Sequence, residues 1–107
     1  MLKQTKFDGS NLTGVSFFAC FAKGATFQGA NLSLADLEQG DFEGADFTNA
    51  ILEGAFVNAA NFTGIKLDGS DWTDVVLRKD VYQQLCAVAS GTNPTTGVDT
   101  RDSLSCE

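Results

Sequence analysis

The stretch ADFTNAILEGAFVNAANFTG, residues 45–64, repeats a five-residue pattern four times. In each unit the first residue is alanine and the third is large and apolar. Counting outward by fives gives fifteen apolar centres: Phe7, Leu12, Phe17, Ala22, Phe27, Leu32, Leu37, Phe42, Phe47, Leu52, Val57, Phe62, Leu67, Trp72 and Leu77. Most residues two places before these centres are small. A period of five fits neither the 3.6 of an α-helix nor the 2.0 of a strand.

Glycine recurs two residues after the centres. It occupies eight of these fifteen positions: Gly9, Gly14, Gly24, Gly29, Gly44, Gly54, Gly64 and Gly69. Because glycine accepts a positive φ, it suits a corner of the chain. The pattern predicts a coil in which each unit supplies a short side, two inward side chains and a corner. Successive coils would hydrogen-bond to one another.

Units such as ADFTN, ANFTG and ANLSL resemble the pentapeptide-repeat family, whose pattern is A(D/N)LXX, and the register is unbroken over residues 5–79. The resemblance implies an all-β solenoid, a right-handed quadrilateral β-helix with four units per coil. Fifteen units would make about four coils, with residues twenty apart stacked in columns such as Phe7, Phe27 and Phe47. At a strand spacing of ~4.8 Å, the solenoid would be roughly 18 Å tall.

The register fails at Asp80, where a small inward residue is due. The sequence DVYQQLCAVASG, residues 80–91, predicts a helix with Asp80 as N-cap and Gly91 at the C-terminal stop. Three apolar residues would form its buried stripe: Val81, Leu85 and Val88. We therefore expect two parts, a repeat of residues 1–79 and a short α-helical cap of residues 80–107.

The rest of the cap, residues 92–106, is predicted to form a turn followed by one further helical turn. In TNPTTG, residues 92–97, Pro94 fixes φ and Asn93 can bond its own backbone. In DTRDSLSC, residues 99–106, Asp99 or Thr100 can act as N-cap while Leu104 packs down. An open solenoid end exposes apolar side chains and backbone edges, so these elements would cover the last coil, including Trp72 and Leu77.

The start of the chain offers no comparable cover, only Leu2 in register with the repeat. We expect the first coil either to meet another molecule, which includes self-association through this N-terminal coil, or to have lost an N-terminal extension.

Three cysteines are too few for a disulfide scaffold. Cys20 falls in the small inward series, where a free thiol behaves as a small apolar group. Cys86 and Cys106 both fall in the cap, and a bond between them would stabilise it by roughly 3 kcal/mol in the chain-entropy model. Their position favours that bond, whereas two reduced, buried thiols would be normal in a cytosol.

A second resemblance covers residues 77–106. LRKDVYQQLCAVASGTNPTTGVDTRDSLSC resembles the C-terminal segment of pentapeptide-repeat proteins of the thylakoid lumen in cyanobacteria and chloroplasts. It carries the LRxD start, the LC of the helix, the SGTNPxTGxxTRxSLxC run and the paired cysteines. The resemblance implies a lumenal location after removal of a targeting segment and a Cys86–Cys106 disulfide. The biochemical function of that family is not established.

Charge and composition exclude several classes of function. Seven basic against fourteen acidic residues give a net charge of −7, which argues against direct nucleic-acid binding. No run approaches the ~20 apolar residues of a membrane span. The chain has no histidine, no C-x-x-C pair and no phosphate-loop glycine pattern, so we expect no catalytic site, no metal and no cofactor. The recurring aspartates predict a solvated ladder.

Several large apolar residues occupy outward positions: Phe18, Phe21, Phe56, Leu34 and Ile51. Phe18 and Phe21 flank one corner of the first coil, and exposed aromatic residues can mark a contact site. We therefore name Phe18, Phe21 and Phe56 as candidate contacts for an unidentified protein partner.

The sequence favours a non-enzymatic structural or interaction scaffold of the thylakoid lumen, redox-sensitive if its cap disulfide is accessible. The alternative is a gyrase-binding protein that mimics DNA, as in the quinolone-resistance branch of the family. Five basic residues interrupt the acidic surface and count against that alternative: Lys6, Lys23, Lys66, Arg78 and Lys79. An enzyme is the third and most remote reading.

Overall fold

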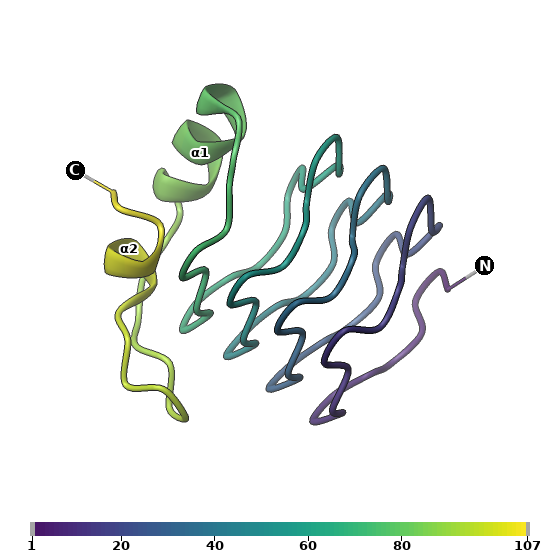
Figure 1. Cartoon of the computed structure of the whole chain (residues 1–107), viewed down its shortest axis with the longest axis horizontal. Coiled ribbons are helices and arrows are strands. Elements are labelled where there is room, and N and C mark those ends of the chain that lie inside the picture. Colours follow the sequence, from purple (N-terminus) through teal and green to yellow (C-terminus); the bar gives the residue numbers. More distant parts are fainter. Residues whose placement is uncertain (1, 107) are drawn as a thin grey trace.

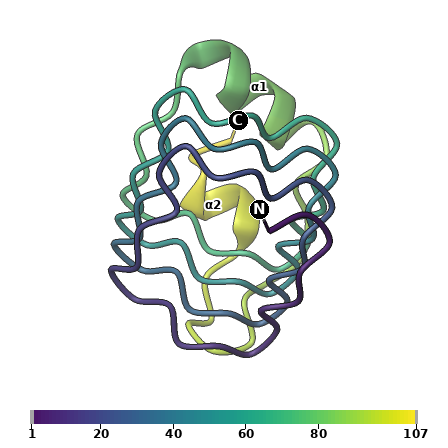
Figure 2. The same ribbon diagram turned by 90° about the vertical axis from the view of Figure 1, so that its right-hand side faces the viewer.

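The protein is represented by a computed structural model of the chain, in which residues 2–106 are described. Its main part is a stack of coils along the long axis, and two short helices lie together at the C-terminal end (Figure 1). Viewed along the stack, successive coils overlap in one closed outline (Figure 2). The chain therefore forms a solenoid with a separate covering segment at one end.

Parallel bridges join residues twenty apart, from Lys6 and Thr26 at the first coil to Ile51 and Asp71 at the last. The apolar centres from Phe7 to Leu52 each donate their backbone N–H to the next coil; Phe7, for example, donates to the carbonyl of Thr26 at 2.7 Å. This spacing agrees with four five-residue units per coil. Within residues 2–106 the pairing consists of isolated bridges rather than long strands, because each side contributes only one bridging residue.

Aromatic rings fill the interior in columns. The ring of Phe27 stacks on those of Phe7 and Phe47, with centroids 5.2 and 5.0 Å apart. Phe42 and Phe62 stack at 5.8 Å in a neighbouring column. The predicted column of residues twenty apart is confirmed, and burying each of these rings contributes ~1.5–3 kcal/mol before entropy is counted.

The corners all use the left-handed backbone region. The eight glycines that follow the centres have positive φ, as predicted. Seven non-glycine residues at the same place in the repeat share it: Gln4, Ala19, Leu34, Gln39, Asn49, Ala59 and Asp74. The turn therefore imposes positive φ on whatever residue occupies the corner, and these seven positions carry backbone strain.

Helix α1 spans Lys79–Cys86 and follows Arg78, its N-cap, which makes no side-chain capping bond. The predicted N-cap role of Asp80 is wrong, because Asp80 lies in the first turn and pairs with Arg78 at 3.4 Å. The predicted stripe is correct for Leu85, which is buried, and in part for Val81. Val88 lies beyond the end of the helix and is 58% exposed, so its inclusion was wrong.

The predicted helix stop at Gly91 is also wrong, because α1 ends five residues earlier, at Cys86, with Ala87 as C-cap. Gly91 has a φ of +85° and lies against Gly69 of the last coil. A Cβ at Gly91 would approach the Gly69 nitrogen to 3.0 Å. Gly91 therefore permits close backbone contact between cap and solenoid.

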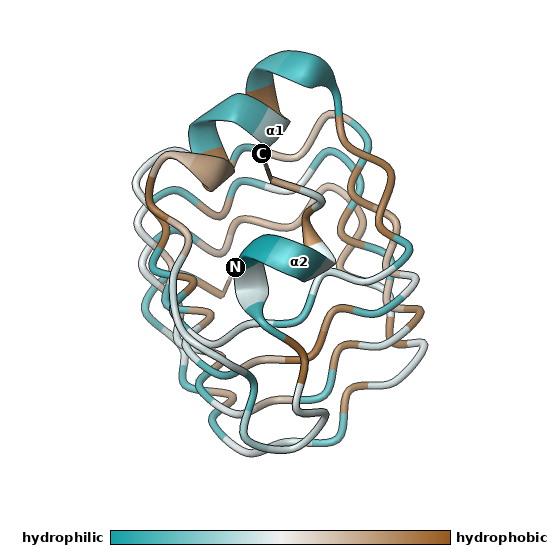
Figure 3. Ribbon diagram, turned by 90° about the vertical axis from the view of Figure 1, so that its left-hand side faces the viewer, coloured by the Kyte–Doolittle hydropathy of each residue, from teal (hydrophilic) through white to brown (hydrophobic). Residues whose placement is uncertain are grey.

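Helix α2 spans Thr100–Ser103 and lies across the end of the stack (Figure 3). The Ser103 hydroxyl accepts the backbone N–H of Trp72 at 2.9 Å, and Leu104 is buried beside the core. Trp72 is 1% exposed, and its indole N–H donates to the Ser70 hydroxyl at 2.6 Å. The tail thus covers the centre of the last coil.

Asn93 fastens the segment between the two helices. Its side chain is fully buried, and its amide group donates to the carbonyls of Gly69 at 2.9 Å and of Asn49 and Ala50 at 3.2 Å each. Its side-chain oxygen accepts two backbone N–H groups of the following turn, as the sequence predicted. Ile51 is 8% exposed, so its predicted outward exposure is wrong.

Candidate functional site

The regular pairing of coils is already lost along residues 55–59, where the chain leaves the last coil toward α1. In the coil below, Leu37 donates its N–H to the carbonyl of Phe56 at 2.7 Å. One coil further, the equivalent N–H of Val57 should reach Val76, but within residues 2–106 it has no hydrogen-bond partner. The segment 75–78 has moved away from its expected place in the stack.

Three further backbone groups at this break lack a partner in the described chain. They are the N–H of Ala59, the N–H of Val76 and the carbonyl of Ala55. In a continuous stack the first would bond to residue 78 and the other two to each other. Unpaired backbone groups of this kind form a sheet edge that can accept another strand.

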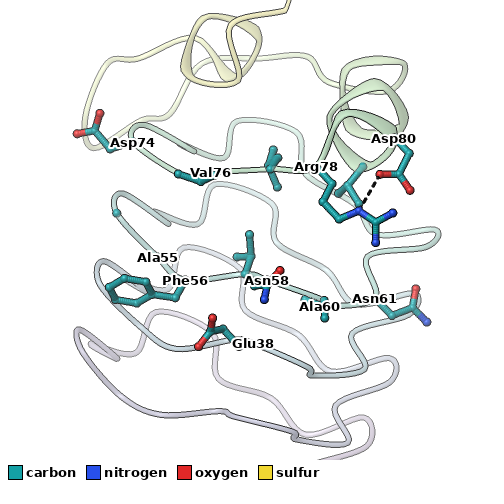
Figure 4. A pocket seen from close by; sticks show the side chains of 15 residues that line it. Glu38, Ala55, Phe56, Asn58, Ala60, Asn61, Asp74, Val76, Arg78 and Asp80 are labelled. Atoms are coloured by element: carbon teal, nitrogen blue, oxygen red, sulfur yellow. Dashed lines mark ion pairs between the residues drawn. The ribbon is translucent and has the colours of Figure 1, made fainter.

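The break opens as a groove of about 710 Å³ between residues 54–61 and residues 74–81 (Figure 4). Phe56 and Val76 lie on opposite walls and are 56% and 88% exposed. Ala60 lies on the lower wall with Phe56, and Leu77 and Val81 also line the groove. A groove of this size and apolar lining is typical of a binding site.

The charged residues around the groove are mostly acidic. Glu38 and Asp74 line it and form no salt bridge within residues 2–106, and Asp80 pairs with Arg78 at the end near α1. Counting these four residues, the groove has a net charge of −2 from three acids and one base. A ligand with a positive charge would therefore be favoured.

The recurring carboxylates serve the turns of the repeat. Asp36 and Asp46 each accept the N–H of the residue two places on, at 2.9 Å, and Asp71 accepts that of Thr73 at 3.0 Å. Asp71 is 2% exposed, so the prediction of a solvated position fails there. Burial by itself would raise the pKa of Asp46, but hydrogen bonds from Thr48 and Gln28 and the charge of Lys66 lower that pKa overall.

In the described part of the chain, no three histidine, cysteine or acidic residues gather in a way that could hold a metal ion. None of the helices in residues 2–106 is long and apolar enough to cross a membrane.

The three predicted contact aromatics are exposed but separate. Phe18 and Phe21 are 52% and 59% exposed on the first coil, and Phe56 lies two coils further on. None of the observed ring contacts among residues 2–106 involves any of the three. Of the three, Phe56 lines the groove. Sequence reasoning did not find the groove itself, since residues 75–79 keep the repeat pattern.

Cys86 and Cys106 are joined by a disulfide that links the end of α1 to the chain after α2. Both residues are partly exposed. The Tyr82 hydroxyl donates to the carbonyl of Ser105 at 2.6 Å, which ties the same two segments together. Cys20 is a free cysteine packed against the core, and burial raises the pKa of its thiol.

Stacked twenty-residue coils, inward aromatic columns and positive-φ corners define a repeat solenoid. The family of pentapeptide repeats matches residues 2–39 and 27–64, and the chain belongs to the pentapeptide-repeat family. Solved structures of this family imply that the solenoid is a right-handed quadrilateral β-helix.

The relatives that the chain resembles point to one compartment. A crystal structure of a pentapeptide repeat protein from the Arabidopsis thaliana thylakoid lumen is 36% identical, with a TM-score of 0.55, over 99% of this chain and 91% of that one. The Arabidopsis thylakoid lumenal protein TL20.3 is 54% identical over 43 residues, which are 40% of this chain and 15% of that protein.

The Arabidopsis thylakoid lumenal 15 kDa protein 1 is 52% identical over 46 residues, 43% of this chain and 20% of that protein. The matched segments thus span a fifth or less of these two relatives. The recognition from the sequence is confirmed, and the chain is a pentapeptide-repeat protein of the thylakoid lumen.

Proposed function

We propose that the protein is a non-enzymatic scaffold of the thylakoid lumen that binds a protein partner at the groove beside α1. The observation that supports this most directly is an apolar groove bordered by unpaired backbone groups, at the point where the coil pairing ends. Pentapeptide-repeat proteins are generally structural proteins, which agrees with this role. The solenoid holds the lower wall rigidly, because residues 54–61 continue a hydrogen-bonded stack.

Partner binding would depend on the redox state of the cap. The Cys86–Cys106 disulfide restrains the end of α1, and α1 begins at the groove. A dithiol reductant would transfer two electrons and two protons to this bond, giving two cysteine thiols and leaving the reductant as a disulfide. Loss of the covalent link would give α1 more freedom and alter the upper wall of the groove.

Affinity capture from thylakoid lumen tests the proposal. The oxidised protein should retain a reproducible partner, and the reduced protein should retain several-fold more or less of it. Phe56→Ser should abolish capture, whereas Val88→Ser, at an equally exposed residue outside the groove, should leave it unchanged. A Phe18→Ser/Phe21→Ser variant examines the first-coil alternative. If neither the oxidised nor the reduced protein captures a partner, the proposed role is wrong.

A further inference from the structure

We infer that the groove takes an extended peptide segment of the partner, added as a strand between residues 55–59 and residues 76–78. This inference rests on the proposed interaction role and names its mode. The favoured segment consists mainly of small or β-branched residues, whose side chains point alternately to the two sides of the strand. It also carries a lysine or arginine that lies near Glu38 or Asp74.

The pairing pattern of the solenoid gives the reason for a strand. In the lower coils each side makes three hydrogen bonds to the coil above it. Leu37, a centre residue, and Gln39, a corner residue, donate their N–H groups to two carbonyls of that coil, and the carbonyl of Ala35 accepts one N–H group from it. The N–H groups of Val57 and Ala59 and the carbonyl of Ala55 repeat that arrangement with no partner in residues 2–106. A polypeptide backbone supplies carbonyls and an N–H group at this spacing, as in strand addition to exposed sheet edges.

The opposite wall offers a second edge. The N–H and the carbonyl of Val76 are both unbonded in the described structure, and the Val76 side chain is exposed. An inserted strand could therefore bond to both walls, with alternate side chains directed past Phe56 and Val76. The net charge of −2 around the groove favours a basic segment over an acidic one.

Amide hydrogen exchange tests the free protein first. The N–H groups of Val57, Ala59 and Val76 should exchange at least about tenfold faster than those of Leu37 and Gln39, which hold the equivalent bonds one coil below. Equal protection of both sets would overturn the inference, because the groove would then be closed. Protection that increases with protein concentration would also overturn it, in favour of a second copy of the chain.

A set of capped heptapeptides then tests binding. Valine and threonine alternate in these peptides, which carry one, two or three lysines at varied positions, and each is added at about 1 mM. At least one should protect the Val57 and Ala59 amides about tenfold or more. N-methylation of its alternate backbone amides should abolish that protection, whereas simple apolar adhesion would survive it. The inference fails if no peptide protects these amides or if the methylated peptide protects equally.

Charge is examined with a matched pair of double variants. Glu38→Gln/Asp74→Asn should weaken peptide binding about three- to tenfold, whereas Glu53→Gln/Asp102→Asn, which removes two acids outside the groove, should change it less than twofold. Equal effects of the two pairs would contradict a local charge preference. Peptide protection with no captured lumenal partner would contradict only the proposed role. A captured partner without peptide protection would contradict only the strand-addition mode.

Discussion

Replacing Asn93 should remove a large share of the stability that joins the cap to the solenoid. Its amide donates to three backbone carbonyls, and its oxygen accepts two N–H groups, all inside a fully buried site. Each such bond contributes about 1 kcal/mol net, and the longer ones contribute less. Because the carbonyls of Gly69 and Asn49 would also lose the amide donor, Asn93→Ala should lower the free energy of unfolding by about 3 kcal/mol.

A second substitution separates the role of the amide donor from that of the oxygen. Asn93→Asp keeps the shape and the oxygen that accepts from Thr95 and Thr96, but it turns a second oxygen toward the carbonyls of Gly69, Asn49 and Ala50. At neutral pH this variant should be less stable than Asn93→Ala, since a buried carboxylate would face three acceptors.

The destabilisation by Asn93→Asp should become smaller as the pH falls. Burial and the facing carbonyls would raise the pKa of the introduced carboxyl in the folded state. A raised folded-state pKa means that the stability is present at low pH and is lost as the pH rises through that pKa. The protonated carboxyl can also donate to one carbonyl. Asn93→Asp should therefore recover part of its lost stability, relative to the wild type, as the solution is acidified.

Urea unfolding followed by the fluorescence of Trp72, the single tryptophan, measures these changes at the cap boundary. Asn11→Asp is a suitable control because Asn11 is exposed, and its side-chain hydrogen bonds within residues 2–106 are those that its oxygen accepts from Thr13. That control should change stability by less than about 0.5 kcal/mol. If Asn93→Ala costs less than about 1 kcal/mol, or Asn93→Asp behaves like Asn93→Ala at every pH, the bonds assigned to Asn93 do not hold the cap.

Three further predictions use the same unfolding assay. Ala59→Gly should stabilise the protein by about 0.5–1 kcal/mol because it relieves the strain of a positive φ at a corner. The control Ala87→Gly, at a residue with right-handed helical φ, should destabilise the protein by a similar amount. If both substitutions change the stability equally, the corners are not strained. Reductant should lower the free energy of unfolding of the wild-type protein by about 3 kcal/mol. The same reductant should not change the stability of the Cys86→Ser/Cys106→Ser variant, which has no disulfide to reduce. If the wild type is also unchanged, the disulfide does not contribute to stability. The lowered pKa of Asp46 means that its contribution is present above the unfolded-state pKa and is lost as the pH falls through the folded-state value, so Asp46→Asn should flatten the acid side of the stability curve; parallel curves would contradict this.

The repeat could be predicted from the sequence because one local rule applies at every unit. Side chains such as Phe27 and Phe47 reach the same column whenever coils have twenty residues, so periodicity alone gives their neighbours. The N-cap of α1 was misplaced by two residues, because Asp80 is a good N-cap by type but the chain turns at Arg78. The local bonds of Asn93 were visible in its turn sequence, whereas its carbonyl partners lie 24 to 44 residues away.

The groove was hidden for a different reason. Residues 75–79 satisfy the repeat pattern, with Leu77 at a centre position, yet they do not pair with residues 55–59. The five-residue period shows which side chains can point inward. Backbone hydrogen bonding between coils also depends on the path that the following segment of the chain takes. Here the chain must reach α1, whose Leu85 is buried in the core and whose last residue is joined to Cys106. These are long-range constraints that a single sequence does not display.

The last coil of a β-solenoid has a backbone edge that is either covered by other parts of the protein or left open. In this protein one part of that edge is covered and another part is open. On one side, Ser103 and Asn93 supply side-chain atoms to backbone groups of the last coils, so those groups are covered by the protein itself. On the other side residues 75–78 do not pair with residues 55–59, and the N–H groups of Val57 and Ala59 stay open in the described chain. The open edge lies beside the helix whose end carries the disulfide, so a change in cap packing would alter the groove before it disturbed the coils below. Any redox effect on partner binding should therefore appear without loss of the stacked core.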